Sequence, residues 1–600
     1  MPSSFRSLLV PGRARWFLAL CVTGVLAAAC SDDDTTKKRG GDDAGTGDGS
    51  ANGGEGGSAG NATAGTGASG GSAGTGAAGG TGGSGAVGGS GAVGGSGAVG
   101  GSGAVGGSGA VGGSGAVGGS GGTTGGTGGG TGGTAGASTG GSAGTAGTGG
   151  TGPVLFCGDG VVDLTKEECD GNAEGRAGNT VTCDTNCKLK SWCNITPTPA
   201  AGAPGIGCIF PPAGRASGGT YATISGVGFD SSTTVTIGGA AATMIFRSPT
   251  EITFFAPTGT VNSWADVVVQ NSSGLTATRT SAFAFHKDAN VAMNANDTGA
   301  DSLRAKITAA ASGDFVTFDR FVAGQTIQLG SQIAIAKNLT LVGMGAGRTV
   351  LDGGGTHPVM SLGTNTIELF GLTVTNGSGS NGGGVRAGGT RLTMTECAVV
   401  GNTSSGEGGG IYLDSAGYLH LVRSTVSGNT GNAGAGIRLV ANTVPPTGLL
   451  SNSTVSGNTG DGIFSDIPLT VENSTIVSNT GAGIVARLSP CTISGSIVAK
   501  NGNDVTGGSG FVSLGYNLIG VAPVGGPWGV SDKTGTNGAP LDPLLSGLAL
   551  NFGLTQTHRL LTGSPAIDGG DPISTLTEDQ ARMPRPSGGV VDIGSVELQQ

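Results

Sequence analysis

The clearest pattern in this chain is a two-part repeat of apolar and polar positions in its second half. The first part is a glycine-rich step ending on an aliphatic residue, spaced by about 26 residues and once by about 21, at Val385, Ile411, Ile437, Ile463 and Ile484. The second part is a β-branched run that closes on asparagine, at residues 397–402, 424–429, 453–458, 474–479 and 496–501. Each repeat therefore predicts at least two short strands and a turn.

Repeats of this length cannot bury an apolar face alone, so successive copies must stack and share one core. Because crossovers between parallel strands are right-handed, the pattern predicts a right-handed parallel β-helix over residues 287–545. We interpret the closing asparagines as structural, since asparagine tolerates the left-handed conformation and its amide can bond the backbone at a corner. In stacked coils these amides can also form a ladder.

The start of the predicted β-helix has its own pattern. Residues 297–307 resemble the short capping helix that opens many β-helix surface proteins, and residues 315–318, 326–329 and 339–343 follow as first strands. A cap is expected because an open coil end is an exposed sheet edge.

Short alternating runs at residues 221–225, 234–237, 251–255 and 265–269 predict a small β-sandwich over residues 211–286. The segments 219–229, 235–239 and 269–274, with the Ala256-Pro257 step, resemble an IPT/TIG immunoglobulin-like domain. The resemblance implies a spacer or a binding module, and we favour the spacer.

Six of the ten cysteines fall within a module at residues 153–210, at Cys157, Cys169, Cys183, Cys187, Cys193 and Cys208. In an exported protein they predict a disulfide framework whose pairing stays open. Metal binding is the alternative, although no histidine lies near. The module resembles the short cysteine-rich repeats of myxobacterial surface proteins. The remaining pair in the β-helix, Cys397 and Cys491, is expected to stay as buried free thiols.

Residues 30–152 are almost entirely Gly, Ser, Ala and Thr. Such a stretch cannot bury enough apolar surface to offset backbone ordering, so it predicts a disordered tether with a mean reach of about 60 Å. A six-residue β-helix repeat is the competing structure, but one valine per six residues offers no continuous core.

The N-terminus has the pattern of an export signal. Arg6, Arg13 and Arg15 precede an apolar run at residues 16–25 that is too short to span a bilayer. This predicts a signal peptide over residues 1–29.

The tract Leu-Ala-Ala-Ala-Cys that ends at Cys30 resembles a bacterial lipobox. The resemblance implies lipidation of Cys30, a membrane as partner, and, with Ser31 next, the outer membrane and cell surface as location. An ordinary secretory peptide is the alternative.

The C-terminal segment, residues 546–600, resembles the end of the choice-of-anchor Q family of bacterial β-helix proteins. The resemblance rests on residues 563–570, 579–582, 585–586 and 591–597.

Composition and strand geometry limit the function. The net charge is −10 with no run of Lys or Arg, which argues against nucleic acid as a partner. If Ile411 points inward, its neighbour points outward, and the same register gives an outer column of aromatic rings, guanidinium groups and carboxylates. This predicts a glycan-binding face made of Arg386, Tyr412, Asp414, Arg438, Phe464 and Asp466. The alternative is a solvated face with occasional aromatic residues.

Together these patterns predict a non-enzymatic cell-surface lipoprotein that displays a β-helix for adhesion or for binding polysaccharide or another cell-surface molecule. No catalytic residue, cofactor or metal site is predicted. The polygalacturonase signatures are absent, but a carbohydrate-active β-helix enzyme, either a polysaccharide lyase or a glycosidase, stays as the alternative. A structural envelope protein is the second alternative.

Overall fold

The computed structural model describes residues 195, 197–414, 417–441, 447–507 and 510–599. The predicted signal peptide, Cys30 and the tether lie outside these residues, as do five cysteines of the predicted disulfide module, Cys157, Cys169, Cys183, Cys187 and Cys193. Within the described residues, no helix is both long and apolar enough to cross a membrane.

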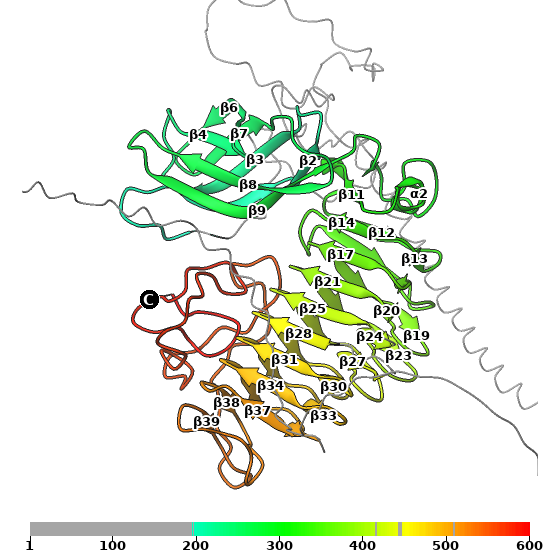
Figure 1. The fold of residues 1–600 in the computed structure, drawn as a ribbon, viewed down its shortest axis with the longest axis vertical. Helices are drawn as coiled ribbons and strands as arrows, with labels where there is room; N and C mark the ends of the chain where they lie inside the picture. Colours follow the sequence, from blue (N-terminus) through cyan, green and yellow to red (C-terminus); the bar gives the residue numbers. More distant parts are fainter. Residues whose placement is uncertain (1–194, 196, 415–416, 442–446, 508–509, 600) are drawn as a thin grey trace, which may run out of the picture. The chain divides into compact units, whose positions relative to one another are not determined.

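The first described domain is a two-sheet β-sandwich (Figure 1). One antiparallel sheet has the order β1 (Gly205–Phe210), β3 (Tyr221–Val227), β7 (Glu251–Phe255) and β6 (Thr243–Arg247). The other has the order β2 (Ala213–Arg215), β9 (Thr276–His286), β8 (Ser263–Gln270), β4 (Thr234–Ile237) and β5 (Ala240–Ala241). Alternate residues of β3 are buried, and Ile224 packs in the core with Phe254 and Phe283. The predicted sandwich is confirmed.

The second domain is a parallel β-helix whose strands stack in three sheets (Figure 1). The β10–β37 sheet contains β10 (Val291–Ala292), β11 (Asp314–Phe318), β14 (Leu339–Val342), β17 (Thr366–Phe370), β21 (Arg391–Thr395), β25 (Tyr418–Val422), β28 (Thr447–Ser451), β31 (Leu469–Glu472), β34 (Cys491–Ser494) and β37 (Phe511–Ser513).

The β12–β39 sheet contains β12 (Gln325–Gln328), β15 (Thr349–Asp352), β18 (Thr373–Thr375), β22 (Ala398–Val400), β26 (Thr425–Ser427), β29 (Thr454–Ser456), β32 (Thr475–Val477), β35 (Ile497–Ala499), β38 (Leu518–Ile519) and β39 (Lys533–Thr534). The β13–β36 sheet contains β13 (Ile333–Ile335), β16 (Met360–Leu362), β20 (Val385–Gly388), β24 (Ile411–Asp414), β27 (Ile437–Leu439), β30 (Ile463–Ser465), β33 (Ala482–Ala486) and β36 (Asn503–Thr506). A short pair, β19 (Ser378–Gly379) and β23 (Thr403–Ser404), lies between coils.

The aliphatic residues of the repeat stack in one row inside the β-helix. Strand pairing aligns Val385, Ile411, Ile437, Ile463 and Ile484, and all five side chains are fully buried. The predicted coil register is therefore correct.

The closing asparagines form the expected ladder. In each coil the asparagine donates its backbone N–H and its side-chain amide to the Oδ1 of the next coil's asparagine, as from Asn402 to Asn429 at 2.9 and 3.0 Å. Bonds of the same kind join Asn429, Asn458, Asn479 and Asn501.

The closing asparagine was also expected to take the left-handed conformation, and this was wrong. The residue with positive φ is the one before the ladder asparagine, for example Gly401 at 66° and Lys500 at 58°. Glycine is favoured there because it adopts this conformation without steric cost.

A second ladder, which the repeat did not reveal, is made of serines. The backbone N–H of Ser424 donates to Ser453 Oγ at 3.1 Å, and the same bond joins Ser453 to Ser474 and Ser474 to Ser496. Asn517 continues the row by accepting from the N–H of Ser496. These buried bonds satisfy N–H groups at the turn that precedes each strand of the β12–β39 sheet.

The predicted cap is present at the first coil. Helix α2 (Leu303–Ala309) begins after Ser302, whose Oγ accepts from the N–H of Ala305. Its side chains Leu303 and Ile307 are buried in the core of the β-helix. The open edge of the first coil is thereby covered.

The C-terminal strap, defined here as residues 546–599, lies along the outer face of the β12–β39 sheet. The outward hydroxyls of that face are buried: Thr454 donates to Gln580 Oε1 at 2.7 Å, and Gln580 Nε2 donates to Thr425 at 3.1 Å. Farther along, the N–H of Ser595 donates to Thr475 at 3.0 Å. The strap therefore occupies one of the three outer faces of the β-helix.

The described cysteines differ in state. Cys208 is disulfide-bonded, while the framework predicted around it stays a prediction. Cys397 and Cys491 are buried free thiols, as expected. Burial raises the pKa of Cys397 to about 12 and raises that of Cys491 as well, which keeps both thiols protonated.

Candidate functional site

The predicted glycan-binding residues lie on the outer face of the β13–β36 sheet. Pairing of adjacent strands aligns Arg386 with Tyr412, Tyr412 with Arg438, and Arg438 with Phe464, in one column across β20, β24, β27 and β30. Asp414 ends β24, and Asp466 directly follows β30. The structure thus brings the six residues onto one face of four successive coils.

Their exposure differs from the expectation of a solvated column. Arg386 is exposed, and Asp414 and Phe464 are half-buried. Tyr412 is 8% exposed, however, and Arg438 and Asp466 are 2% exposed. The inward–outward alternation was correct, but outward side chains on this face cover one another.

Arg438 is buried because every part of its guanidinium group has a partner. Its Nη2 lies 2.6 Å from Asp466 Oδ2, its Nε lies 3.1 Å from Glu407 Oε2, and its Nη1 donates to the carbonyl of Leu439 at 2.7 Å. The guanidinium carbon also lies 4.7 Å from the centre of the Phe464 ring. Arg438 therefore fixes the geometry of this face, and it presents little surface to a ligand.

Asp466 holds a second arginine in place. Arg487 Nε and Nη2 lie 2.5 Å from the two oxygens of Asp466, and its guanidinium lies 5.4 Å from the Phe464 ring centre. Burial alone would raise the pKa of Asp466, but the bonds and charges of Arg487 and Arg438 outweigh it and hold that pKa below its ordinary value. Asp466 therefore stays ionised.

We define the Phe464 cluster as Phe464, Arg438, Arg487, Asp466 and Glu407. Arg487 is 50% exposed and Glu407 is 38% exposed, so these two and the half-buried ring form its accessible part. Arg487 and Glu407 were not predicted from the sequence. Arg487 follows the last repeat of the aliphatic row by three positions, which the shorter final interval obscured, and Glu407 lies in the turn before β24.

The β10–β37 sheet carries a second arginine–aromatic contact. Arg391 lies over the Tyr418 ring at 4.2 Å, and His420 meets the same ring edge-on at 6.2 Å between centres. Burial and the charge of Arg391 lower the pKa of His420. This pair gives a useful comparison for the Phe464 cluster, because it places an exposed arginine on a different face.

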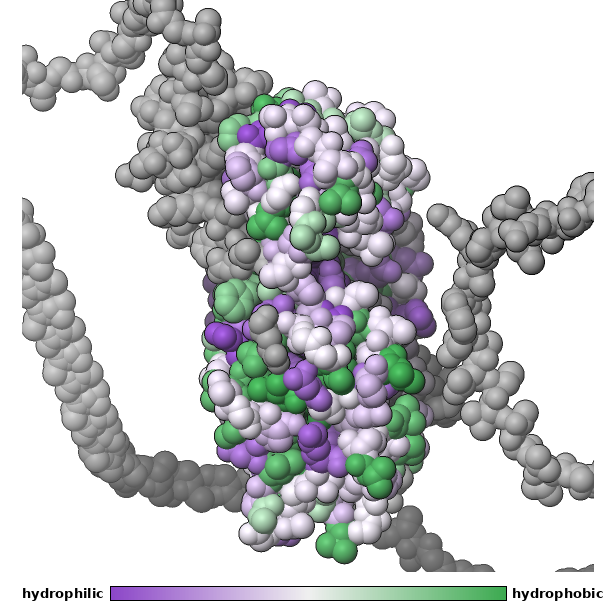
Figure 2. Space-filling view, turned by 90° about the vertical axis from the view of Figure 1, so that its left-hand side faces the viewer, coloured by the Kyte–Doolittle hydropathy of each residue, from purple (hydrophilic) through white to green (hydrophobic). Residues whose placement is uncertain are grey.

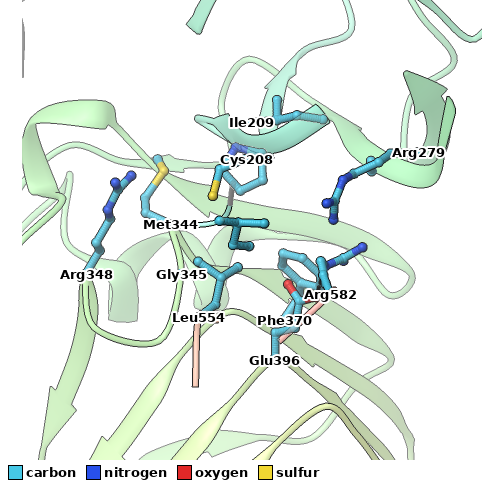
Figure 3. A pocket seen from close by; sticks show the side chains of 14 residues that line it. Cys208, Ile209, Arg279, Met344, Gly345, Arg348, Phe370, Glu396, Leu554 and Arg582 are labelled. Atoms are coloured by element: carbon cyan, nitrogen blue, oxygen red, sulfur yellow. Dashed lines mark hydrogen bonds and ion pairs between the residues drawn. The ribbon is translucent and has the colours of Figure 1, made fainter. Parts of the chain in front are cut away.

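A small pocket is lined by residues of the sandwich, the β-helix and the C-terminal strap (Figure 3). Glu396 accepts from Arg423 at 3.0 Å and from Arg582, and these two cations outweigh its burial and lower its pKa to about 2. Burial also lowers the pKa of Arg279 and of Arg348 to about 10. The cavity volume is about 50 Å³, which suits a few waters and excludes a sugar ring.

No group of three or more His, Cys, Asp or Glu suited to a metal ion occurs in the part of the chain that the structure describes.

Comparison with protein families identifies the two domains. Residues 204–286 are an IPT/TIG domain, and residues 328–498 are a right-handed β-helix region. Both matches agree with the fold classes that the sequence patterns predict. No curated protein matches the chain.

Solved structures show limited likeness. The chain aligns with the pectate lyase Pel9A at 16% identity over 51% of this chain and 96% of that one, with a TM-score of 0.32. An auxiliary nutrient binding protein from Bacteroides ovatus ATCC 8483 aligns at 20% identity over 14% of this chain, with a TM-score of 0.12. A structure from Bacteroides thetaiotaomicron VPI-5482 aligns at 25% identity over 14%, again at 0.12. This chain spans 22% and 18% of the length of those two Bacteroides proteins.

Proposed function

We propose that this chain is a lipid-anchored cell-surface protein whose β-helix binds polysaccharide, through the face that carries the Phe464 cluster. The observation that carries the proposal is the half-buried Phe464 ring with two guanidinium groups fixed 4.7 and 5.4 Å from its centre. Aromatic rings beside cations and carboxylates suit a sugar ring with charged substituents.

Preorganisation supports this role. Asp466 is buried, and it orients both arginines before any ligand arrives. A site whose side chains are already ordered loses less conformational entropy on binding. Arg386, exposed on β20 in the same column, extends the charged face over further coils.

The C-terminal strap excludes one of the other two outer faces of the β-helix. The strap buries Thr425, Thr454 and Thr475 on the β12–β39 sheet, which removes that face from ligand contact. Figure 2 views the molecule from the left-hand side of Figure 1, the side on which the strap lies. Hydrophilic and hydrophobic residues are intermixed on this side. The β13–β36 sheet instead gathers charge and an aromatic ring in one cluster.

The proposed lipid anchor and cell-surface location are supported by the sequence alone. The lipobox-like tract ending at Cys30 and the glycine-rich residues that follow suit a protein held on a membrane and displayed beyond it.

The binding proposal is tested with the full chain on immobilised polysaccharides, one rich in uronate and one neutral such as dextran. We expect Phe464→Ala and Arg487→Ala each to weaken uronate binding about tenfold, equal to about 1.4 kcal/mol. The matched control is Arg391→Ala, which removes an exposed arginine stacked on Tyr418 of another face and leaves binding unchanged.

Equal affinity in the wild type and in both cluster variants would remove this face as the site. Release of shortened oligosaccharides by the wild-type chain would favour the enzyme alternative instead, and the same variants would then show whether the cluster takes part.

A further inference from the structure

The two ends of the β-helix are closed differently. At the first coil, helix α2 packs Leu303 and Ile307 against the core. At the last coil, the loop at residues 521–531 turns back, and Trp528 packs against Phe511 with 6.2 Å between ring centres. The loop covers the core at that end, but it adds no strand to β37.

Strand β37 has a free edge. It pairs with β34 through Cys491 and Phe511, Thr492 and Val512, and Ile493 and Ser513, and no described strand pairs with its other side. Figure 1 shows β37 at the end of the stacked strands of its sheet. A free edge presents unpaired backbone N–H and C=O groups that accept another strand.

Strand β37 and the loop that follows it are apolar and carry no charged side chain. On and directly after β37, Val512 is 44% exposed and Leu514 is 64% exposed, and in the loop at residues 521–531 Val524 and Val530 are 104% and 109% exposed. The sequence contains no Asp, Glu, Lys, Arg or His between Asp504 and Asp532. Edge strands are normally protected from association by charged side chains or proline, and β37 itself contains neither.

Carboxylates bond both ends of the loop that carries Val524 and Val530. Asp504 Oδ2 accepts from the N–H of Val521 at 2.6 Å. Asp532 Oδ2 accepts from the N–H of Gly529 and from Ser513 Oγ, both at 2.7 Å. Both ends of the loop are thus bonded to buried or half-buried carboxylates.

We propose that the edge of β37, with Val512, Leu514, Val524 and Val530, is the contact of a two-fold dimer, and that its occupant is a second copy of this chain. In a two-fold contact, residues near the axis meet their own copies, so a charge there would face a like charge. Neither β37 nor the loop at residues 521–531 brings a charged side chain to such an axis, which fits that condition. Antiparallel pairing centred on Val512 would place Phe511 opposite Ser513 of the second copy and would satisfy the free edge of each.

The first test measures the mass of the full chain carrying Cys30→Ser by analytical ultracentrifugation over a range of concentrations. We expect a monomer–dimer equilibrium, and we expect Val512→Lys to give monomers because two ammonium groups would meet at the axis. The matched control is Ile573→Lys, at an 83% exposed position of the strap, which keeps the dimer. Thermal unfolding of both variants should match that of the parent, since both side chains are exposed.

The second test uses Val512→Cys with diamide as oxidant. Directly opposed residues of an antiparallel pair have Cα atoms about 4.5–5.5 Å apart, within the range that a disulfide spans. We expect a covalent dimer on a non-reducing gel. Leu488→Cys, 61% exposed in the turn between β33 and β34, should stay monomeric.

A parent chain that is monomeric at every concentration, or a Val512→Lys variant that still dimerises, would overturn the proposal. Sedimentation of a monomeric chain with phosphatidylcholine vesicles, lost in Val524→Asp, would identify a lipid surface as the occupant and would equally overturn it.

Discussion

Arg585 and Glu597 form an ion pair in which both side chains are fully buried, with 3.0 Å between Nε and Oε2. The remaining donors of Arg585 bond the carbonyls of Asp592 and Gly594 and the Oδ1 of Asn452, which lies in the turn before β29. The pair thus fixes the fold of the C-terminal strap and also joins it to a coil.

We expect Arg585→Met to destabilise the protein by about 3–5 kcal/mol, because it leaves the Glu597 carboxylate buried without its countercharge. Urea unfolding measures the change. The double variant Arg585→Met with Glu597→Leu removes both charges, and we expect it to recover part of the loss. A single variant within about 0.5 kcal/mol of the wild type would show that the pair contributes little.

Breaking the asparagine ladder should also be costly. Asn429 donates its N–H and amide to Asn458 and accepts both bonds from Asn402, so Asn429→Ala leaves buried groups without partners. We expect a loss of about 2–3 kcal/mol in urea unfolding. Asn432→Ala, at an exposed position near the same coil, is the control and should change stability by less than about 0.5 kcal/mol. Equal effects of the two variants would contradict the structural role of the ladder.

Docking of the strap should depend on pH through His558. Its Nε2 lies 2.7 Å from Ser456 Oγ on β29, its Nδ1 lies 2.7 Å from the carbonyl of Ser546, and burial lowers its pKa. Because the folded pKa lies below the unfolded value of about 6.5, the unfolded chain binds more protons as pH falls. The stability that His558 contributes is therefore present above about pH 6.5 and is lost at lower pH.

The difference between the wild type and His558→Gln isolates this effect, with unfolding measured at pH 7.5 and pH 5. We expect the wild type to lose more stability than the variant. Two strap carboxyls act in the opposite direction, since burial raises the pKa of Asp579 and Asp592 to about 6 and their protonation favours the folded state. Both proteins keep those carboxyls, so their contribution cancels. The same pH dependence in both proteins would remove His558 as the cause.

The lipid anchor gives a prediction that concerns location alone. Cys30→Ala removes the thiol to which a lipid would attach, so we expect the chain to move from the membrane fraction to the soluble fraction. Metabolic labelling with a fatty acid should mark the wild type and leave the variant unlabelled. A variant that stays with the membrane would show that another part of the chain holds it there.

Much of the fold could be predicted from sequence because its determinants are local and repeated. The row from Val385 to Ile484 recurs at intervals of 26, 26, 26 and 21 residues, and the ladder from Asn402 to Asn501 at intervals of 27, 29, 21 and 22, so one coil predicts the next. In the β10–β37 sheet, the segments at residues 315–318 and 339–343 were predicted as strands, but the strands of the later coils were not, since their segments vary in composition. The serine ladder was also missed. Its members Ser424, Ser453, Ser474 and Ser496 open the repeated runs, but serine at a turn is equally typical of a solvated position.

The candidate site was harder to predict for a physical reason. Alternation along a strand gives the direction of a side chain, and this placed Arg386, Tyr412, Arg438 and Phe464 correctly on one face. Burial depends also on what lies beside that side chain. Glu407 comes from the turn before β24, and Arg487 has the position of Asp466 in the next coil, beyond the predicted set. Their charges made it favourable for Arg438 and Asp466 to be covered.

The C-terminal strap also limits how this chain can change its length in evolution. A stacked coil can in principle be duplicated or deleted, because each ladder asparagine offers the same bonds to its neighbour, and each such event would change the length by about 4.8 Å. The strap instead contacts successive coils one by one, from Glu396 with Arg582, through Thr454 with Gln580, to Gly495 with Gly594. An added or lost coil in that interval would shift the coil residues away from their partners in the strap. We therefore expect natural variation in coil number to occur before Glu396.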